Sequence, residues 1–298
     1  MEKTWTVIEM IQWGKQFFEE KNIDSPRLTM ELLLAHVTGL SRVQLYTSFD
    51  KPLSGEELDA LRPLVRRRAK FEPLQYILGT TDFYGLNLVV TPDVLIPRPE
   101  TEVLVESVIA ALRAKCSGET GYTDAGLRVL LDIGTGSGCI ALALAKQYPA
   151  LRVVGIDVSA RAVATAQCNA ERLGVHNVEF RTIDILTHEG VATLQKEYGR
   201  FDVLVSNPPY IAADEMPELQ AEVGQYEPSI ALTDGHDGLT FYRRFAAIFP
   251  ALLQSNGLFA VEIGYAQESQ VVKAFEEQGF SVSVVQDFAG IPRVVVRA

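Results

Sequence analysis

The chain has 298 residues, of which 47% are hydrophobic and 22% charged, and its formal net charge is −11. These are ordinary values for globular proteins, and the length suits one large domain or two modest ones. The three cysteines and four histidines show neither C-x-x-C nor other metal-type spacing, so no disulfide scaffold and no bound metal is expected. The sequence begins without a signal-peptide apolar core and contains no run of membrane-spanning length, which predicts a reduced, cytoplasmic setting without membrane contact.

Residues 1–80 have apolar side chains at helical spacing. The clearest runs are residues 7–18, 28–36 and 58–65. Ser54 with Glu57 has the form of a capping box, which predicts the start of the third helix. We therefore predict a small helical-bundle domain over residues 1–80. Within it, His36 is interpreted as a core histidine and Arg66–Arg68 as a solvated helix face, with a substrate contact by these arginines left open.

A connector with hairpin character is predicted over about residues 81–97, and a helix over residues 99–115. The Gly/Ser/Thr-rich stretch 116–126 is expected to be a surface loop. Arg98 and Glu100 lie between prolines at the junction of the two parts of the chain. They could shape the entrance of a substrate site or form an interdomain salt bridge.

A strand, a glycine-rich turn and a helix are predicted in succession from residue 127 to residue 148. Such a corner brings backbone close to a nucleotide-type ligand and points helix N–H groups toward it. The dinucleotide fingerprint G-x-G-x-x-G does not fit, because its third glycine would fall on Cys139. The residues expected at the ligand are Asp132, Gly134, Thr135, Gly136, Ser137 and Gly138.

Two further predicted strands end at acidic residues. The strand 151–156 ends at Asp157, whose carboxylate could accept hydrogen bonds from both hydroxyls of a ribose. The strand 178–183 ends at Asp184, which could border an adenine. Each acid could instead be a helix N-cap at a strand-to-helix turn.

The strand predicted over residues 201–206 breaks off at Asn207-Pro208-Pro209-Tyr210. The two prolines lack N–H donors and fix φ, so this corner is stiff and presents the Asn207 amide and the Pro208 carbonyl in a set geometry. Two such acceptors can bind both N–H bonds of an NH₂ group conjugated to a π-system and aim its lone pair at an electrophile. A Pro-Pro turn with an Asx-type cap is the alternative.

The chain ends with a strand at residues 258–263 and then two strands, 280–285 and 293–296, with little between them. Such a closing pair is typical of an antiparallel edge on an otherwise parallel sheet. Residues 81–298 are therefore expected to form an α/β domain.

The ordered glycine loop, acidic strand ends and Asn-Pro-Pro-Tyr corner resemble the class I methyltransferases that use S-adenosyl-L-methionine (AdoMet) to modify planar amino groups. More narrowly, the chain resembles the release factor glutamine methyltransferases, the PrmC/HemK family. The closer match is carried by Ile96–Glu102, by Tyr210-Ile211 and by Glu227–Leu239. With the helical N-terminal region, the resemblance covers essentially the whole chain.

The resemblance implies a mostly parallel, seven-stranded Rossmann-like sheet with an antiparallel edge in residues 81–298, preceded by a helical domain that docks the protein substrate. The implied reaction moves a methyl group from AdoMet to the side-chain amide nitrogen (N5) of the glutamine in the Gly-Gly-Gln motif of class 1 peptide chain release factors. The coproduct is S-adenosyl-L-homocysteine, and the modification modulates translation termination.

The resemblance also implies residue roles. Asn207 Oδ1 and the Pro208 carbonyl would accept the two hydrogens of the attacking nitrogen, while Tyr210 would wall the pocket. Ile185 stands where some members have an aromatic residue over the adenine, so the base would pack on an aliphatic surface. The implied substrate contacts are Asn207, Pro208, Pro209, Tyr210, Arg98 and Glu100, and the implied cofactor contacts are the glycine-loop residues above with Asp157, Asp184, Ile185 and Asn207.

Two other functions remain open at this point. An adenine N6 methyltransferase acting on DNA or RNA would use the same corner on a flipped-out base, and it would need a basic surface. Of the 27 Lys/Arg and 38 Asp/Glu residues, 11 of each lie in residues 1–80, so the whole net charge of −11 falls on the part expected to be catalytic. This balance argues against nucleic acid binding. A catalytically inactive AdoMet-binding protein is the third possibility. The intact Asn207 and glycine loop argue against it.

Overall fold

The computed structural model describes residues 4–117 and 128–297. Most of the surface loop predicted at 116–126 therefore lies outside the described residues. The chain divides into two compact units, the first formed by Met1–Gly79 with Gln220–Tyr226 and the second by Thr80–Leu219 with Glu227–Ala298. The first unit thus takes in a short segment that a boundary at residue 80 assigns to the second part of the chain.

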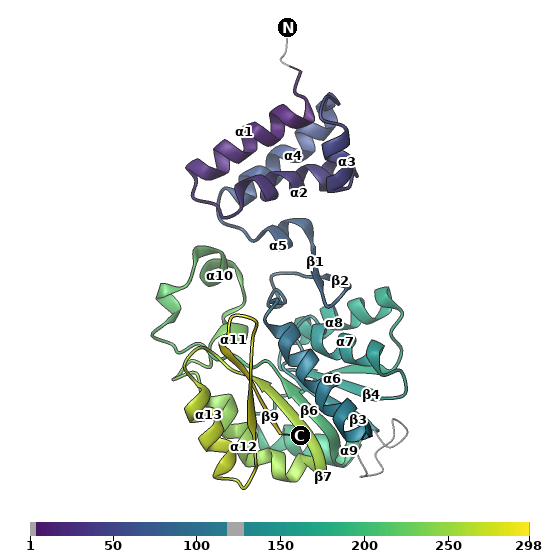
Figure 1. Ribbon diagram of the computed structural model, residues 1–298, viewed down its shortest axis with the longest axis vertical. Coiled ribbons are helices and arrows are strands. Elements are labelled where there is room, and N and C mark those ends of the chain that lie inside the picture. Colours follow the sequence, from purple (N-terminus) through teal and green to yellow (C-terminus); the bar gives the residue numbers. More distant parts are fainter. Residues whose placement is uncertain (1–3, 118–127, 298) are drawn as a thin grey trace. The chain divides into compact units, whose positions relative to one another are not determined.

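The first unit is helical (Figure 1). Its helices are α1 (Val7–Glu20), α2 (Pro26–Thr38), α3 (Arg42–Thr47), α4 (Gly55–Arg68), α5 (Leu74–Leu78) and α10 (Ala221–Tyr226). The capping box predicted at Ser54 and Glu57 starts α4. Helices α1 and α2 pack closely, because a Cβ atom at Gly14 would lie 2.3 Å from the Met30 side chain.

Two sequence-based interpretations of the helical unit are wrong. His36 is exposed and is not part of the core. Arg68 is not solvated: it is 3% exposed and pairs with Glu222 of α10 at 2.6 Å. A charge can be buried in this way only when it is paired, and the partner comes from a segment distant in sequence. Arg66 is exposed, as predicted.

The second unit begins with the predicted hairpin, in which β1 (Thr80–Phe83) and β2 (Leu86–Val89) are antiparallel. Its two turn residues, Tyr84 and Gly85, have φ angles of 48° and 71°, as a tight two-residue hairpin turn requires. The fully buried Asn169 side chain bonds both the N–H and the carbonyl of Val89, at 2.7 and 3.0 Å, and donates to the Ser137 carbonyl at 2.9 Å. The hairpin is therefore tied to the glycine loop.

A seven-stranded sheet forms the centre of this unit. Its strands are β3 (Val129–Ile133), β4 (Arg152–Asp157), β5 (Val178–Thr182), β6 (Phe201–Ser206), β7 (Leu253–Glu262), β8 (Ser283–Gln286) and β9 (Pro292–Arg297). The spatial order is β5-β4-β3-β6-β7-β9-β8, and β9 runs antiparallel to both of its neighbours. The predicted α/β fold with a mostly parallel sheet is confirmed. The antiparallel strand is inserted between β7 and the edge strand β8.

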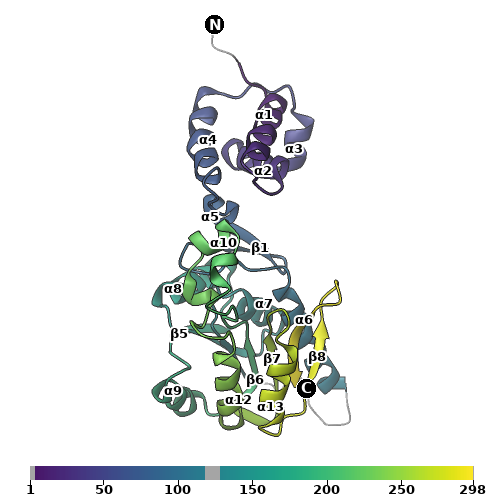
Figure 2. The ribbon, with the colours of Figure 1, turned by 90° about the vertical axis from the view of Figure 1, so that its left-hand side faces the viewer.

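Helices cover both faces of the sheet (Figures 1 and 2). One face packs against α6 (Thr101–Ser117), α7 (Cys139–Gln147) and α8 (Ala160–Leu173), and the other against α9 (His188–Tyr198), α12 (Thr240–Leu252) and α13 (Glu268–Glu276). A 3₁₀ turn at Met216–Glu218 and the short α11 (Ser229–Leu232) lie in the connection between β6 and α12. The inner strands β3 and β6 are buried along their whole length, which explains their continuous apolar sequences.

Candidate active site

A cavity of about 290 Å³ lies in the second unit, at the carboxyl ends of the parallel strands. Ile133, Ile156 and Ser206, at or near the ends of β3, β4 and β6, are among its lining residues. The chain continues from β3 to β4 on one side and returns to β6 on the other. Ligands of open α/β sheets bind at this kind of topological switch point.

The glycine loop forms one wall of the cavity. Gly134 and Gly136 line it and have φ angles of 74° and 54°, in the left-handed region that favours glycine. Apart from its two chain neighbours, a Cβ atom at Gly136 would meet no atom of the described residues within 4 Å, so that position faces open space. Gly138 has a different role, because it caps α7 and a Cβ there would lie 3.0 Å from Phe180.

Three of the predicted ligand contacts have buried side chains that do not face the cavity. Asp132, Thr135 and Ser137 are buried and are not among the described residues that line it. Asp132 Oδ2 accepts hydrogen bonds from Thr135 Oγ1 at 2.7 Å and from the Ala141 N–H at 3.2 Å. Complete burial raises the pKa of Asp132 to about 7. The acid thus joins the loop to the first turn of α7.

Asp157 is at the cavity, at the end of β4. Its Oδ2 accepts from the Gly136 N–H at 3.0 Å and its Oδ1 from the Ser159 N–H at 2.9 Å. A carboxylate oxygen can accept about two hydrogen bonds, so each oxygen keeps capacity for a ligand hydroxyl. Burial raises the pKa of Asp157, and the backbone hydrogen bonds oppose this shift.

Apolar side chains surround the next part of the cavity. Asp184 and the buried Ile185 both line it, and Asp184 Oδ1 accepts from the Leu186 N–H at 2.8 Å. Three more lining residues are apolar yet strongly exposed, namely Val158 at 48%, Leu186 at 41% and Ile230 at 57%. An apolar ligand group would cover them. The sequence reasoning missed these three, although Val158 and Leu186 directly follow predicted site residues and Ile230 lies in a stretch that carried the family resemblance.

The Asn-Pro-Pro corner borders the same cavity. Asn207, Pro208 and Pro209 line it directly after β6. Asn207 Nδ2 donates to Thr101 Oγ1 at 3.0 Å. Tyr210 is not among the described lining residues and packs instead against the core on the α12 face. Burial raises the pKa of its hydroxyl.

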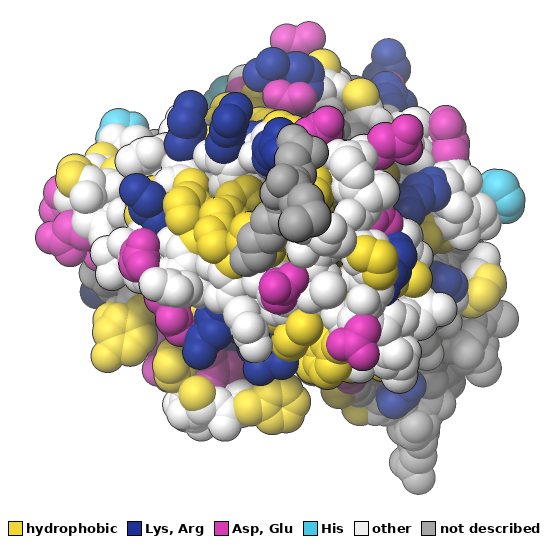
Figure 3. Space-filling view, turned by 90° about the horizontal axis from the view of Figure 1, so that it is seen from above, with side chains coloured by type: hydrophobic (Ala, Val, Ile, Leu, Met, Phe, Trp, Pro, Cys, Tyr) yellow, Lys and Arg dark blue, Asp and Glu magenta, His cyan; other side chains and the backbone are white. Residues whose placement is uncertain are grey.

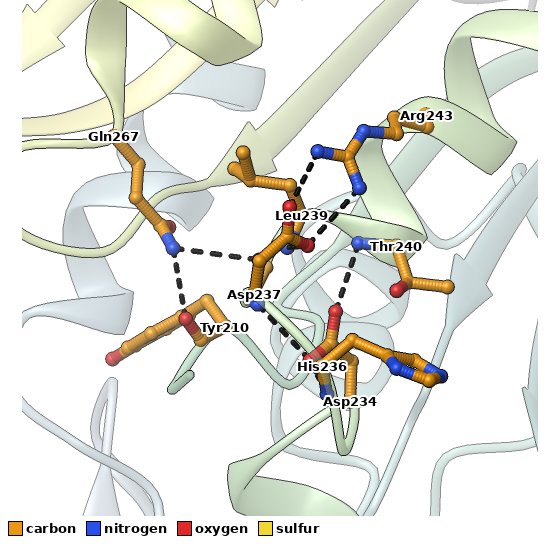
Figure 4. A network of polar contacts seen from close by, with 9 residues as sticks. Tyr210, Asp234, His236, Asp237, Leu239, Thr240, Arg243 and Gln267 are labelled. Carbon is orange, nitrogen blue, oxygen red and sulfur yellow. Dashed lines mark hydrogen bonds and ion pairs between the residues drawn. The ribbon is translucent and has the colours of Figure 1, made fainter. Parts of the chain in front are cut away.

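The Tyr210 backbone is fixed by a polar network (Figure 4). Gln267 Nε2 donates to the Tyr210 carbonyl at 2.8 Å. Asp234, which lines the cavity, accepts from the His236, Gly238 and Thr240 N–H groups at 2.8, 3.0 and 2.9 Å. A Cβ atom at Gly238 would lie 2.3 Å from the Tyr210 carbonyl oxygen. The loop that Asp234 holds therefore sets the position of the residue after Pro209.

Arg98 and Glu100 do not line the cavity among the described residues. Arg98 pairs with the buried Glu227 at 2.6 Å, and both belong to the second unit, so this ion pair is not interdomain. Glu100 is exposed. A role of Arg98 and Glu100 in substrate binding stays a prediction.

Two further residues near Asn207 were missed as polar site groups. Thr101 is the first residue of α6, and Glu262 is the last residue of β7. Both are buried. A carboxylate that ends an apolar strand is a sequence signal that could have identified Glu262.

Among the described residues, no group of three or more His, Cys, Asp or Glu side chains is arranged to hold a metal ion. In the same part of the chain, no helix combines the length and apolar character needed to cross a membrane.

Comparison with protein-family models gives two matches. Residues 9–79 match the PrmC N-terminal domain, and residues 124–283 match a methyltransferase domain.

Full-length relatives are similar to this chain. A release factor glutamine methyltransferase of Geobacter sulfurreducens is 47% identical over 292 residues, which cover 98% of this chain and 96% of the relative. The Chlorobaculum tepidum protein of that name is 41% identical over 98% of this chain and 97% of its own. The Bacillus subtilis protein of that name is 36% identical over 97% of this chain and 96% of its own.

Solved structures share the fold at low identity. The hMettl16 catalytic domain in complex with MAT2A 3′UTR hairpin 6 has a TM-score of 0.54 at 15% identity and covers 79% of this chain and 81% of its own. A human methyltransferase 10 domain containing protein has a TM-score of 0.50 at 18% identity, with coverages of 72% and 89%. At such identities the likeness shows the methyltransferase fold alone.

Proposed function

The chain belongs to the family of release factor glutamine methyltransferases, and we propose that it methylates the side-chain amide nitrogen (N5) of the glutamine in the Gly-Gly-Gln motif of class 1 peptide chain release factors. AdoMet is the proposed methyl donor and S-adenosyl-L-homocysteine the coproduct. The observation that carries the proposal is the Asn207-Pro208-Pro209 corner on the wall of the switch-point cavity, in a chain similar to this family over nearly its whole length.

The residues of the cavity fit AdoMet. Asp157 has acceptor capacity left for two ribose hydroxyls, and the exposed apolar side chains of Val158, Leu186 and Ile230 offer surface for the adenine. The glycine loop leaves open space at Gly136 for a close approach of the ligand to the backbone. A volume of about 290 Å³ lies close to the lower limit of the ~300–1,000 Å³ range of small-molecule pockets.

The proposed chemistry is a direct displacement. AdoMet supplies a methyl group on a sulfonium sulfur, which is open to in-line attack. The glutamine amide nitrogen is a poor nucleophile, because its lone pair is delocalised. Asn207 Oδ1 and the Pro208 carbonyl oxygen would accept its two N–H bonds, orient the lone pair and stabilise the positive charge that develops on nitrogen. Orientation can supply about 7–11 kcal/mol of such a barrier, and aligned dipoles add to it.

Asp157→Ala should weaken AdoMet binding without abolishing the fold. The ribose contacts together should contribute about 1.5–3 kcal/mol, the range for a hydrogen bond to a charged group, so Kd should rise about 10- to 150-fold. Isothermal titration calorimetry checks this. Asp157→Asn, which keeps one acceptor oxygen, should fall between the wild type and the alanine variant. Unchanged affinity in both variants would show that Asp157 only holds the Gly136 and Ser159 N–H groups.

The helical unit is our proposed docking surface for the release factor. It exposes apolar side chains at Trp13, Leu28, Val43 and Tyr46. In the space-filling view, hydrophobic side chains are exposed beside a row of Lys and Arg side chains (Figure 3). Such a mixed surface suits a protein partner.

Val43→Asp should weaken release factor docking while AdoMet affinity stays unchanged, because Val43 is 73% exposed and supports no core packing. Replacing an apolar side chain of the proposed docking surface by a charged one should raise KM for the whole release factor about tenfold. A short Gly-Gly-Gln peptide serves as the control substrate and should be methylated equally by both proteins. An unchanged KM for the whole release factor would remove Val43 from the docking surface.

The proposed activity is tested by incubating the purified protein with labelled AdoMet and purified release factor. Label should enter the wild-type release factor and not a version whose Gly-Gly-Gln glutamine is replaced by alanine. Equal label in both versions, or transfer only to added DNA or RNA, would contradict the proposal.

A further inference from the structure

We propose that Glu262 and Thr101 are positioning residues that fix the orientation of the Asn207 amide, so that Oδ1 and not Nδ2 is presented to the reacting nitrogen. The inference rests on the proposed function and deepens it. It concerns three residues that are far apart in sequence and lie together at the ends of β6 and β7 and the start of α6.

The three side chains form a short polar chain inside the second unit. Thr101 and Glu262 are 2% and 1% exposed. Thr101 Oγ1 accepts from Asn207 Nδ2 at 3.0 Å. The Glu262 carboxyl group lies close enough to the polar side chains of Thr101 and Asn207 for hydrogen bonding from both to lower its pKa. Its backbone is held as well, because the Tyr242 hydroxyl donates to the Glu262 carbonyl at 2.8 Å.

The numbers of hydrogen-bond donors and acceptors on these groups determine the orientation of the Asn207 amide. A carboxylate only accepts hydrogen bonds, and a threonine hydroxyl has a single proton to donate. With Glu262 ionised, that proton goes to the carboxylate, and Thr101 Oγ1 is left to accept from Asn207. The amide must then point its NH₂ group at both neighbours. Its Oδ1 is left for the substrate.

The same donors and acceptors disfavour the flipped orientation of the Asn207 amide. It would place Asn207 Oδ1 against the Glu262 carboxylate, acceptor to acceptor, in a site where low dielectric strengthens the repulsion. A buried carboxylate makes a folded protein no more stable than a well-packed apolar residue in its place. In addition, Glu262 Oε2 has no hydrogen-bond partner among the described residues. A role in setting the amide accounts for this costly group.

The protonation of Glu262 should therefore control the rate. Burial raises the pKa of Glu262 to about 7, while Thr101, Arg293 and Asn207 lower it. The titratable or charged groups that interact with Glu262 are Arg293 on β9, Glu100 before α6, Tyr210 after β6, Tyr242 on α12 and Cys139 on α7. Of these, Glu100 opposes ionisation and Arg293 favours it.

The direction of the pH effect follows from the hydrogen-bond inventory. Above its pKa, Glu262 is a carboxylate and forces the amide orientation. Below its pKa, the protonated carboxyl group can donate to Thr101 Oγ1, and the orientation is no longer forced. Turnover should accordingly fall as the pH drops through about 7.

Glu262→Gln tests the proposal, with the exposed Glu276→Gln as the matched control. A glutamine at position 262 can donate as well as accept hydrogen bonds, so the side-chain amide of Asn207 can flip and exchange its Oδ1 and Nδ2. We expect turnover to fall about 10- to 100-fold, less than the ~10²–10³ for loss of a whole acceptor. The acidic limb of the pH profile should disappear, and AdoMet affinity should stay within about twofold of the wild type. Thr101→Val should share the loss of turnover, and Thr101→Ser, which keeps the hydroxyl, should restore it.

A second measurement does not depend on turnover. Titration of the Glu262 carboxyl group by ¹³C NMR should show a higher pKa in Thr101→Val than in the wild type, because one donor to the carboxylate is removed. An unchanged pKa, an unchanged pH profile in Glu262→Gln, or a serine variant as slow as the valine variant would overturn the positioning role. A wild-type protein that methylates no release factor would count against the proposed function, and the titration alone would then decide whether the hydrogen-bond chain exists.

Discussion

Asn207→Ala should reduce the turnover of the release factor about 10²–10³-fold, the usual cost of one well-placed acceptor in a preorganised site. AdoMet affinity should stay within several-fold, because the amide acts mainly on the attacking nitrogen, where its interaction strengthens as positive charge builds. Steady-state methyl transfer and calorimetry measure the two quantities separately.

Asn207→Asp is the sharper companion variant. It keeps an acceptor oxygen toward the substrate, so part of the rate lost in the alanine variant should return. The recovery should be incomplete, because the second carboxylate oxygen would face Thr101 and Glu262 where Nδ2 now donates. Normal turnover in both variants would mean that Asn207 merely caps the end of β6.

Gly136→Val should abolish AdoMet binding while the fold survives. The residue has a φ angle of 54°, and its Cβ would point into open space at the cavity wall. A branched side chain there would occupy the space into which the ligand must come close to the backbone. Calorimetry on the folded variant, verified by circular dichroism, measures the loss.

Gly174→Val is the matched control for backbone strain. Gly174 has a φ angle of 65° and caps the end of α8. It is not among the described residues that line the cavity, and no described residue beyond its chain neighbours lies within 4 Å of its Cβ position. Both variants should lose about 1–2 kcal/mol of stability from the left-handed backbone, but only Gly136→Val should lose AdoMet. Unchanged AdoMet binding in a folded Gly136→Val variant would contradict the assignment of the cavity.

The main elements of the fold follow from local sequence patterns. Apolar runs that end at Asp157 and Asn207 predicted the strands whose carboxyl ends build the cavity. Local patterns cannot show which distant segments meet. The position of β9 between β7 and β8, and the packing of Gln220–Tyr226 with the helical unit, depend on long-range contacts. The burial of Arg68 was mispredicted for this reason, since its partner Glu222 is 154 residues away.

The residues of the candidate site likewise include some that local sequence patterns predict and others that only long-range contacts bring to the site. Gly136, Asp157 and Asn207 were identified because each directly follows, or closely follows, a predicted strand, and parallel strand ends share one edge of the sheet. Asp132 was placed at the ligand because a motif gives position along the chain and not the direction of a side chain, which here is buried and does not face the cavity. Thr101 and Glu262 have no motif of their own, and only the fold brings them to Asn207.

The Asn207 corner is proposed to direct a methyl group to the nitrogen of a glutamine amide, and locating the transferred methyl group tests this directly. Tandem mass spectrometry and NMR of release factor methylated with ¹³C-labelled AdoMet identify the atom that carries it. We predict a single methyl group on the N5 nitrogen of the Gly-Gly-Gln glutamine, absent when Asn207→Ala replaces the wild-type enzyme at matched reaction time. A methyl group on any other atom of the release factor, or none on that glutamine, would contradict the proposed role of Asn207.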